Sequence, residues 1–190
     1  MSRTAWLQTT GGVVAILLLT QFCTGVLLAS YYVPSVDHAY TTVSYIDKVV
    51  SSGSWLRSVH HYGSQWLAVF SFLHVVQLFA TRAYESRRVQ WIASILLLGL
   101  IMAAGGTGYS LPWDARAFFS TRVAEGLMGG LPLAGRMARL WLLAGSEIST
   151  LTLSRFFALH VLVVPALIIA VVVWRVFRAR VFDYRHAVTG

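Results

Sequence analysis

Two histidines, His60 and His74, are the residues whose type and spacing most suggest chemistry. They are 14 residues apart in an apolar stretch, so on an α-helix they share one face, about 21 Å apart along the axis. The neighbouring His61 falls on nearly the opposite face. Neutral imidazoles are common metal ligands, although a buried histidine also occurs as a hydrogen-bonded core residue. The spacing therefore predicts two separate sites at two depths, with ligation and packing as alternatives.

The composition is that of an integral membrane protein. The chain has 190 residues, of which 57% are hydrophobic and 12% are charged, about half the charged fraction of a soluble domain. Crossing a bilayer takes about 20 apolar residues. Four segments are long enough: 12–33, 58–80, 90–113 and 156–174. We expect an all-α membrane protein, with these four helices forming one bundle in a single domain over residues 1–190.

Basic residues predict the topology. The net charge is +8, and the short segments on the side of the termini hold eight of the arginines: Arg3, Arg82, Arg87, Arg88, Arg175, Arg178, Arg180 and Arg185. The positive-inside rule then places both termini on the cytoplasmic side of an inner membrane. We call the opposite side outer. The charges suit topology and lipid contact rather than nucleic-acid binding.

Small residues repeat the spacing of the histidines. Gly11 and Gly25 are 14 apart in the first segment, and Ser94 and Gly108 are 14 apart in the third. Small residues let membrane helices pack closely, and glycine also makes room for bulky flat groups at two depths. The two outer connections contain SYIDKVV and GRMARLWLLAG. These amphipathic runs predict surface helices, the second of them covering the outer end of the bundle.

The last segment brings a third histidine to the outer depth. His160 lies near its outer end, as His60 does in the second segment. Two neutral imidazoles facing each other across a bundle suit a six-coordinate haem iron that transfers electrons. Arg57 lies one turn before His60, where it either snorkels to the interface or pairs with a carboxylate near that histidine. The histidines and glycines together favour haem.

Five motifs, in chain order, resemble a known family: Q-F-C-T-G, W-L-R-S-V-H, F-L-H, G-Y-S-L-P-W and T-L-S-R-F-F-A-L-H. The chain resembles the N-terminal half of the cytochrome b/b6 family, the membrane core of quinol-oxidising bc-type complexes. The resemblance covers nearly the whole chain. Its ending after four helices and its G-Y-S-L-P-W-D motif are similar to the split, chloroplast-type version.

The resemblance implies specific roles for residues. His60 and His160 would be the axial ligands of an outer haem b, and His74 would be one ligand of an inner haem. The remaining cofactor-binding residues implied by the family pattern are Arg57 at a propionate of the outer haem, Gly25 and Gly108 beside that haem, Gly11 beside the inner one, and Arg155.

The sequence departs from the family pattern at the inner site. Where relatives place the second inner ligand, this chain has Arg175 or, at the shorter family spacing, Trp174. Neither side chain offers a lone pair to iron. Gln77 stands in place of an arginine, and Ser94 in place of a glycine. The outer haem site is therefore expected to be intact and the inner one degenerate, holding either no haem or a haem bound through His74 alone.

The resemblance implies a haem-b electron-transfer subunit of a quinol-oxidising bc-like complex, not catalytic alone. Its partners would be a C-terminal cytochrome b-type membrane subunit, which supplies the family's Pro-Glu-x-Tyr segment, and a Rieske iron–sulfur protein, in a dimeric complex that uses quinone and quinol. One alternative is a single-haem membrane anchor of another quinone-linked oxidoreductase. A second alternative, from another class, is a haem-free transporter or structural subunit.

Overall fold

The computed structural model describes the backbone of residues 3–130, 132–133 and 135–189, and the side chains of residues 10–178 within these ranges. This part of the chain is helical. Its elements are α1 (Arg3–Ala29), α2 (Ala39–Lys48), α3 (Gly53–Ala80), α4 (Ala83–Ser86), α5 (Arg88–Ser110), α6 (Ala115–Gly129), α7 (Gly135–Leu143), α8 (Thr150–Ala158), the π-helical turn η1 (Leu159–Val163) and α9 (Val164–Thr189).

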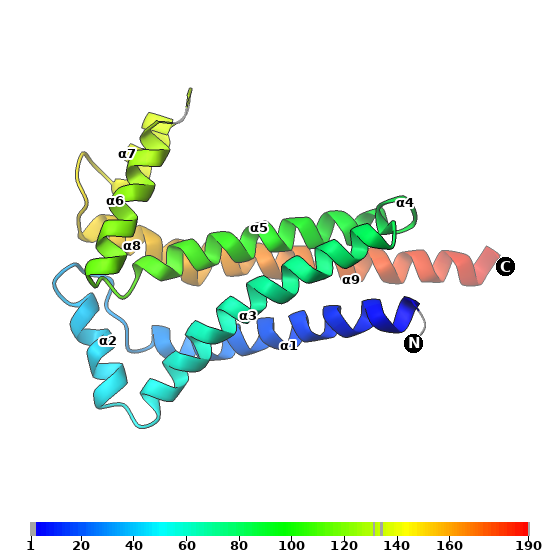
Figure 1. Cartoon of the computed structure of the whole chain (residues 1–190), viewed down its shortest axis with the longest axis horizontal. Coiled ribbons are helices and arrows are strands. Elements are labelled where there is room, and N and C mark those ends of the chain that lie inside the picture. The colour runs from blue at the N-terminus through cyan, green and yellow to red at the C-terminus, as the bar shows by residue number, and fades with distance from the viewer. Residues whose placement is uncertain (1–2, 131, 134, 190) are drawn as a thin grey trace.

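The helices α1, α3, α5 and α9 run as rods along the long axis of the molecule (Figure 1). Four stretches are long and apolar enough to span a membrane, as predicted: Thr10–Ala29, Gly53–Ala80, Arg88–Ser110 and Thr150–Arg178. The fourth joins α8, η1 and α9. In this bundle α1 packs against α3, α3 against α5, and α5 against α9. Contacts between α1 and η1 join the first rod to the fourth.

The ends of the rods differ from the predicted bounds by a few residues. The third ends at Ser110 because Pro112 lacks the N–H that would continue the hydrogen-bond ladder, and Trp113 has a positive φ of 52°. The second begins early, at Gly53, where a Cβ would lie 2.0 Å from the backbone oxygen of Ile46. A glycine is therefore required where α3 begins against the end of α2.

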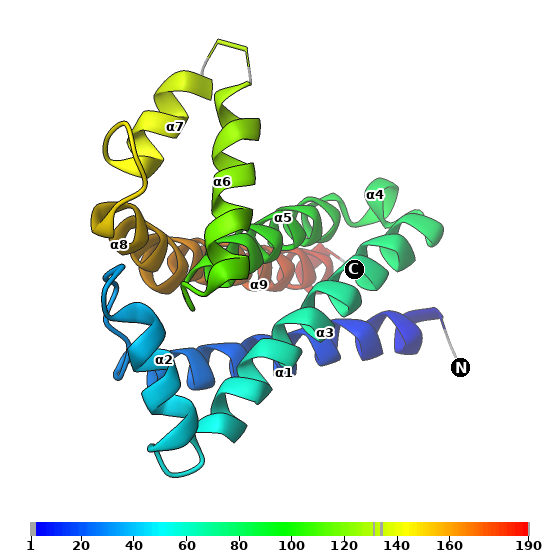
Figure 2. The ribbon, with the colours of Figure 1, turned by 60° about the vertical axis from the view of Figure 1, so that its left-hand side comes forward.

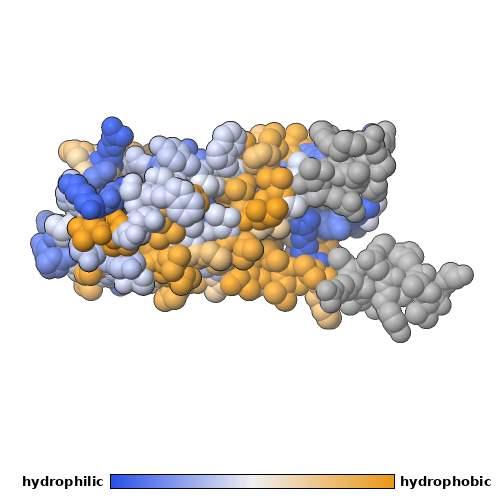
Figure 3. All heavy atoms as spheres, turned by 90° about the horizontal axis from the view of Figure 1, so that it is seen from below, coloured by the Kyte–Doolittle hydropathy of each residue, from blue (hydrophilic) through white to orange (hydrophobic). Residues whose placement is uncertain are grey.

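The two ends of the bundle differ in what they carry. The termini and α4 lie at one end, the inner end, and α2, α6, α7 and α8 lie at the other, the outer end (Figure 1). On the visible face, apolar side chains cover the shafts, and the most hydrophilic ones gather toward the ends (Figure 3). This arrangement matches a bundle that spans a bilayer.

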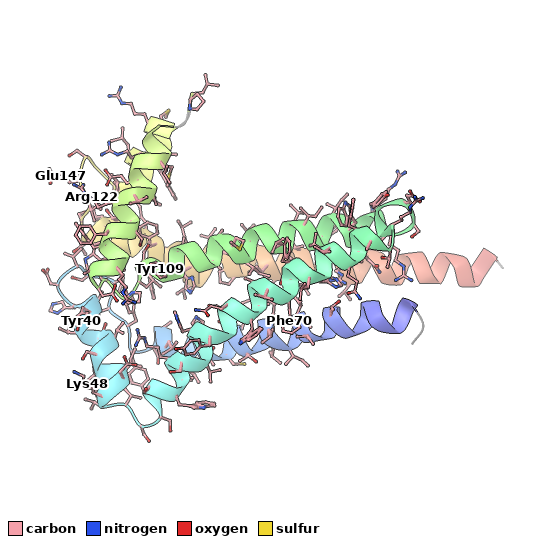
Figure 4. The ribbon with its side chains drawn as sticks, in the orientation of Figure 1. Tyr40, Lys48, Phe70, Tyr109, Arg122 and Glu147 are labelled. Carbon is pink, nitrogen blue, oxygen red and sulfur yellow. The ribbon has the colours of Figure 1, made fainter. Side chains whose placement is uncertain are left out.

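The connection between α5 and α8 forms a hairpin of α6 and α7, which projects sideways from the outer end of the bundle instead of covering it (Figure 1 and Figure 2). The sequence predicted α7 but not α6, whose first turn is capped by Asp114 accepting a hydrogen bond from the Ala117 N–H at 2.8 Å. Buried Glu125 of α6 joins the two helices, because it accepts hydrogen bonds from Arg139 of α7 at 2.5 and 3.0 Å. Arg122, labelled in Figure 4, lies 3.5 Å from the same carboxylate.

The fourth rod contains a π-helical turn over Leu159–Val163, and His160 lies within it. The Val164 N–H donates to the Leu159 oxygen, five residues back, and the next residue, Pro165, has no N–H to donate. The wider turn absorbs the helix defect that the proline creates. Such turns occur often at functional sites.

An apolar layer fills the middle of the bundle. Its buried residues include Leu18, Leu67 and Ile101. Each lies seven residues from both members of a 14-residue pair: Leu18 between the two glycines of α1, Leu67 between the two histidines of α3, and Ile101 between Ser94 and Gly108. The two depths singled out by the spacing are therefore separated by packed hydrocarbon.

Candidate functional site

His60 of α3 and His160 of η1 face each other at the outer depth. Their ring centroids are 6.1 Å apart, and the ring planes are inclined by 80°. A metal ion that bonds an imidazole nitrogen at about 2 Å fits between two such rings. No group of three His, Cys, Asp or Glu side chains suited to a metal occurs in the described part of the chain. Two imidazoles are too few for a zinc site but complete the axial ligands of a haem.

Hydrogen bonds orient the His60 imidazole. The Thr24 hydroxyl donates to the Thr20 carbonyl at 2.7 Å, and its oxygen lies 2.9 Å from His60 Nδ1. Because the hydroxyl hydrogen is already used, the threonine oxygen accepts from an Nδ1–H. That assignment leaves the lone pair on Nε2, which is the nitrogen free to bind a metal.

His160 is oriented in the same way by α5. Its Nδ1 lies 2.9 Å from the Ala104 carbonyl oxygen, which only accepts, so Nδ1 carries the hydrogen. The Thr107 hydroxyl lies 3.4 Å from the same nitrogen. Both outer imidazoles therefore present an Nε2 lone pair and are held from behind, an arrangement typical of histidines that ligate metals.

Glycines make room for the two outer imidazoles. A Cβ on Gly25 would lie 3.2 Å from Cε1 of His60, and a Cβ on Gly108 would lie 2.5 Å from Cε1 of His160. The second distance is too short for any side chain. The two glycines predicted to lie at the outer site are therefore in contact with its histidines.

The two outer arginines have different surroundings. Arg57 forms an ion pair with Asp47 of α2, so this structure joins it to a carboxylate in the first outer connection. Arg155 of α8 lies with its guanidinium 5.2 Å from the centre of the Trp141 ring. Its Nη1 atom is buried and has no hydrogen-bond partner among the described residues. Among the described arginines, Arg155 is therefore the one with a buried side-chain donor left unpaired.

His74 occupies the inner depth with a similar orientation. Its Nδ1 lies 2.8 Å from the Thr10 hydroxyl, which donates to Oε1 of Gln77. The Nε2 of His74 is buried and has no partner among the described residues. A Cβ on Gly11 would lie 3.4 Å from Cε1 of His74 and 4.0 Å from Nη2 of Arg175. The inner site therefore brings these two side chains together across Gly11.

The other inner residues are also placed. Trp174 is 36% exposed, so Arg175 rather than Trp174 takes the position beside the inner site. The hydroxyl of Ser94 is buried and donates back to the Gln90 carbonyl at 2.8 Å. A second imidazole facing His74 is absent from the described side chains. The structure therefore brings together one ligand-type residue and one cation at the inner depth.

Sequence reasoning missed the threonines that orient the histidines. A signal was present, because Thr10, Thr24 and Thr107 each directly precede one of the three glycines that contact a histidine. The threonine bonds the imidazole nitrogen and the glycine makes room for the same ring. At the fourth position of this pattern, 14 residues before Thr107 and Gly108, the chain has Ala93 and Ser94 instead of a threonine and a glycine. The α9 side chain that reaches the inner site is that of Arg175, not a histidine.

Comparison with known families identifies the chain. The family described as Cytochrome b/b6/petB matches residues 2–182. The chain belongs to this family. It is an integral membrane protein of that family, with the four-helix architecture described above. The prediction made from the five motifs is confirmed.

Three relatives of this cytochrome b/b6 chain are similar over most of its length. A menaquinol:cytochrome c reductase cytochrome b subunit of Geobacillus thermodenitrificans is 37% identical over 158 residues, which are 82% of this chain and 70% of that protein. The protein of the same name in Bacillus subtilis (strain 168) is 36% identical over 159 residues, with the same coverage. Cytochrome b6 of Prochlorococcus marinus (strain NATL1A) is 34% identical over 159 residues, 83% of this chain and 73% of that protein.

A solved structure shares the fold. It is titled hyperthermophilic respiratory Complex III and superposes with a TM-score of 0.82 at 24% identity. The match covers 92% of this chain and 47% of that chain, so this cytochrome b/b6 chain spans about half the length of that one.

Proposed function

We propose that the chain is a haem-b electron-transfer membrane subunit of a quinol-oxidising bc-like complex, with an outer haem held by His60 and His160. The observation that carries the proposal is this pair of imidazoles, 6.1 Å apart, each with its Nδ1–H accepted from behind and its Nε2 free. The unpartnered buried donor of Arg155 suits a haem propionate at the same site.

A haem bound there would act as a one-electron carrier whose potential is set by its axial ligands and surroundings. The residues of this chain fix those surroundings. Thr24 and the Ala104 carbonyl hold the rings in one tautomer, and the glycines let them pack close to the helices. The apolar layer around Leu67 keeps water and charge out of the space between the two depths.

The relatives support a quinol as electron source, since two of them are named menaquinol:cytochrome c reductase cytochrome b subunits. We also propose that the partners of this chain are a C-terminal cytochrome b-type membrane subunit and a Rieske iron–sulfur protein, in a dimeric complex. The positive-inside rule supports termini on the cytoplasmic side, because the inner end carries the arginine-rich α4 connection. Residues 1–190 would form one membrane domain.

The test is a pyridine haemochrome assay and an absorption spectrum of the purified complex. The proposal requires haem b with low-spin bis-imidazole character in every chain. A haem-free preparation with a folded bundle would refute it in favour of a transporter or structural subunit.

A single-haem anchor of another oxidoreductase is a second candidate, favoured by Arg175 at the place of the second inner ligand. Both functions need the outer haem, so haem content does not separate them. Purification of the native complex does: a Rieske protein and a membrane subunit with a Pro-Glu-x-Tyr segment belong only to the bc-like function.

Replacing Gly108 tests the outer site sterically. In Gly108→Ala the new Cβ meets the His160 ring, which cannot retreat without breaking its bond to the Ala104 carbonyl. We expect outer haem retention to fall on the order of tenfold, as when a metal-binding histidine loses its orientation. Gly106→Ala is the matched control, because its Cβ has no neighbour within 4 Å. Equal haem contents in the two variants would contradict the placement of His160.

Redox titration distinguishes the roles of the two outer arginines, Arg57 and Arg155. Arg155→Leu removes the cation with a free buried donor, so a propionate beside it loses compensation and the reduced haem is disfavoured. We expect the outer midpoint potential to fall by tens of millivolts, on the order of one charge-assisted hydrogen bond. Arg57→Leu should lower the midpoint potential less, because the Arg57 guanidinium is already paired with the Asp47 carboxylate. A larger fall with Arg57→Leu would show that Arg57 is the main propionate partner.

A further inference from the structure

Three buried polar atoms at the inner end have no hydrogen-bond partner among the described residues: Ser71 Oγ, His74 Nε2 and Gln77 Nε2. The residues lie three apart on α3, and their exposed fractions are 3%, 4% and 4%. Buried polar groups are rarely left without partners. Three of them on one stretch of helix point to a bound group at this depth.

The chemistry of these atoms defines what they bind. His74 Nε2 carries a lone pair, because Nδ1 holds the hydrogen against Thr10, so it needs a metal or a hydrogen-bond donor. Gln77 Nε2 is an amide donor whose own oxygen is already used by Thr10, so it needs an acceptor. A haem supplies both, as iron and as a propionate carboxylate.

A hydroquinone also offers a donor and an acceptor, but the repeated pattern favours haem. The threonine, glycine and histidine at the inner depth, Thr10, Gly11 and His74, repeat the set found at the outer depth, Thr24, Gly25 and His60. The contacts within each set are equivalent as well, since the threonine bonds Nδ1 and the glycine lies against Cε1.

Arg175 determines what lies on the other side of such a haem. Its Nη2 and the Nε2 of His74 are 4.0 and 3.9 Å from the place that a Gly11 Cβ would take. A guanidinium has no lone pair for iron. The ion pairs found in the described part of the chain do not include Arg175. An uncompensated cation at membrane depth is costly and favours an anion beside it.

We propose that the inner site binds a second haem through His74 alone, and that Arg175 makes the open coordination position of this haem a binding site for a small anion. The proposal rests on the proposed function, because it requires a haem protein. The planar donor fork of the Arg175 guanidinium would hold the anion through charge-assisted hydrogen bonds, and the bound haem would supply the iron. The anion would displace solvent only, so no covalent bond of the protein would change and no electron would be transferred.

The test uses the purified haem-loaded complex, electron paramagnetic resonance and a titration with sodium azide. We expect one low-spin and one high-spin ferric haem per chain, with azide shifting the absorption of the high-spin haem only. Arg175→Leu should keep the high-spin signal and weaken azide binding at least tenfold. Arg178→Leu, one turn further along α9 and exposed, should leave azide binding unchanged. Arg175→Lys, which keeps a charge but loses the fork, should be intermediate and guards against a folding defect in the leucine variant.

Different failures have different meanings. A single low-spin haem, or two low-spin haems, would overturn this inference and leave the proposed function in place. Azide affinity unchanged in Arg175→Leu, with the inner potential lowered, would show that Arg175 pairs with a propionate instead. Complete absence of haem would overturn the proposed function itself.

Discussion

His160→Ala is expected to abolish the low-spin signal of the outer haem. The variant leaves His60 without its facing imidazole, because no third metal-binding side chain joins the pair among the described residues. Loss of an orienting partner of a metal-binding histidine already costs about 10–100-fold in affinity, and loss of the ligand itself costs at least as much. Electron paramagnetic resonance and haem content of the purified protein measure the effect.

His61→Ala is the control for this prediction. His61 is adjacent to His60 in sequence but exposed, and its imidazole contacts Gln65 at 3.2 Å on its own helix. Its removal should leave both haem content and spin state as in the wild type. If His160→Ala keeps the full low-spin signal, the outer site has been assigned to the wrong residue.

The sequence alone was sufficient for the four membrane spans and for the depths of the histidines. Both follow from distances along a helix. A bilayer demands about 20 apolar residues, and a 14-residue interval returns to one helical face whatever the surroundings. The same spacing also accounts for the core, because Leu67, midway between His60 and His74, is buried between the two depths.

Helix α6 shows where pattern reasoning failed. It buries Ala117, Thr121 and Glu125 and exposes Phe119 and Val123. That is the reverse of the apolar-inside pattern by which a surface helix is recognised. The buried carboxylate is stabilised by Arg139 of α7, a contact between helices that no local pattern contains.

Contacts between distant segments account for the other omissions. Arg57 of α3 pairs with Asp47 of α2, and the turn between the two helices brings them together. Ala104 contacts His160 through its backbone oxygen, so its residue type does not indicate the contact. The π-helical turn also depends on context, since Pro165 marks a helix defect without fixing whether the chain kinks or widens. These features require the folded bundle.

Arg175→His is expected to give the inner depth a second low-spin bis-imidazole haem. The Arg175 side chain reaches the same point beside Gly11 as the His74 ring does, so an imidazole at that position approaches the open side of a haem held by His74. The number of low-spin haems per chain should rise from one to two, and azide should no longer bind. The variant would also restore a pair of bis-imidazole carriers separated by the apolar layer, the arrangement that a relay across the membrane requires.

Trp174→His provides the sharpest control for this last prediction. Trp174 is the neighbouring residue of α9 and corresponds to the shorter family spacing, but it is 36% exposed. A histidine there is turned about 100° around the helix from position 175, so it should leave the spin state of the inner haem unchanged. A second low-spin signal in Trp174→His and not in Arg175→His would show that α9 presents residue 174 to the inner site. A second low-spin signal already present in the wild type would mean that another group, from this chain or a partner, completes the coordination in place of Arg175.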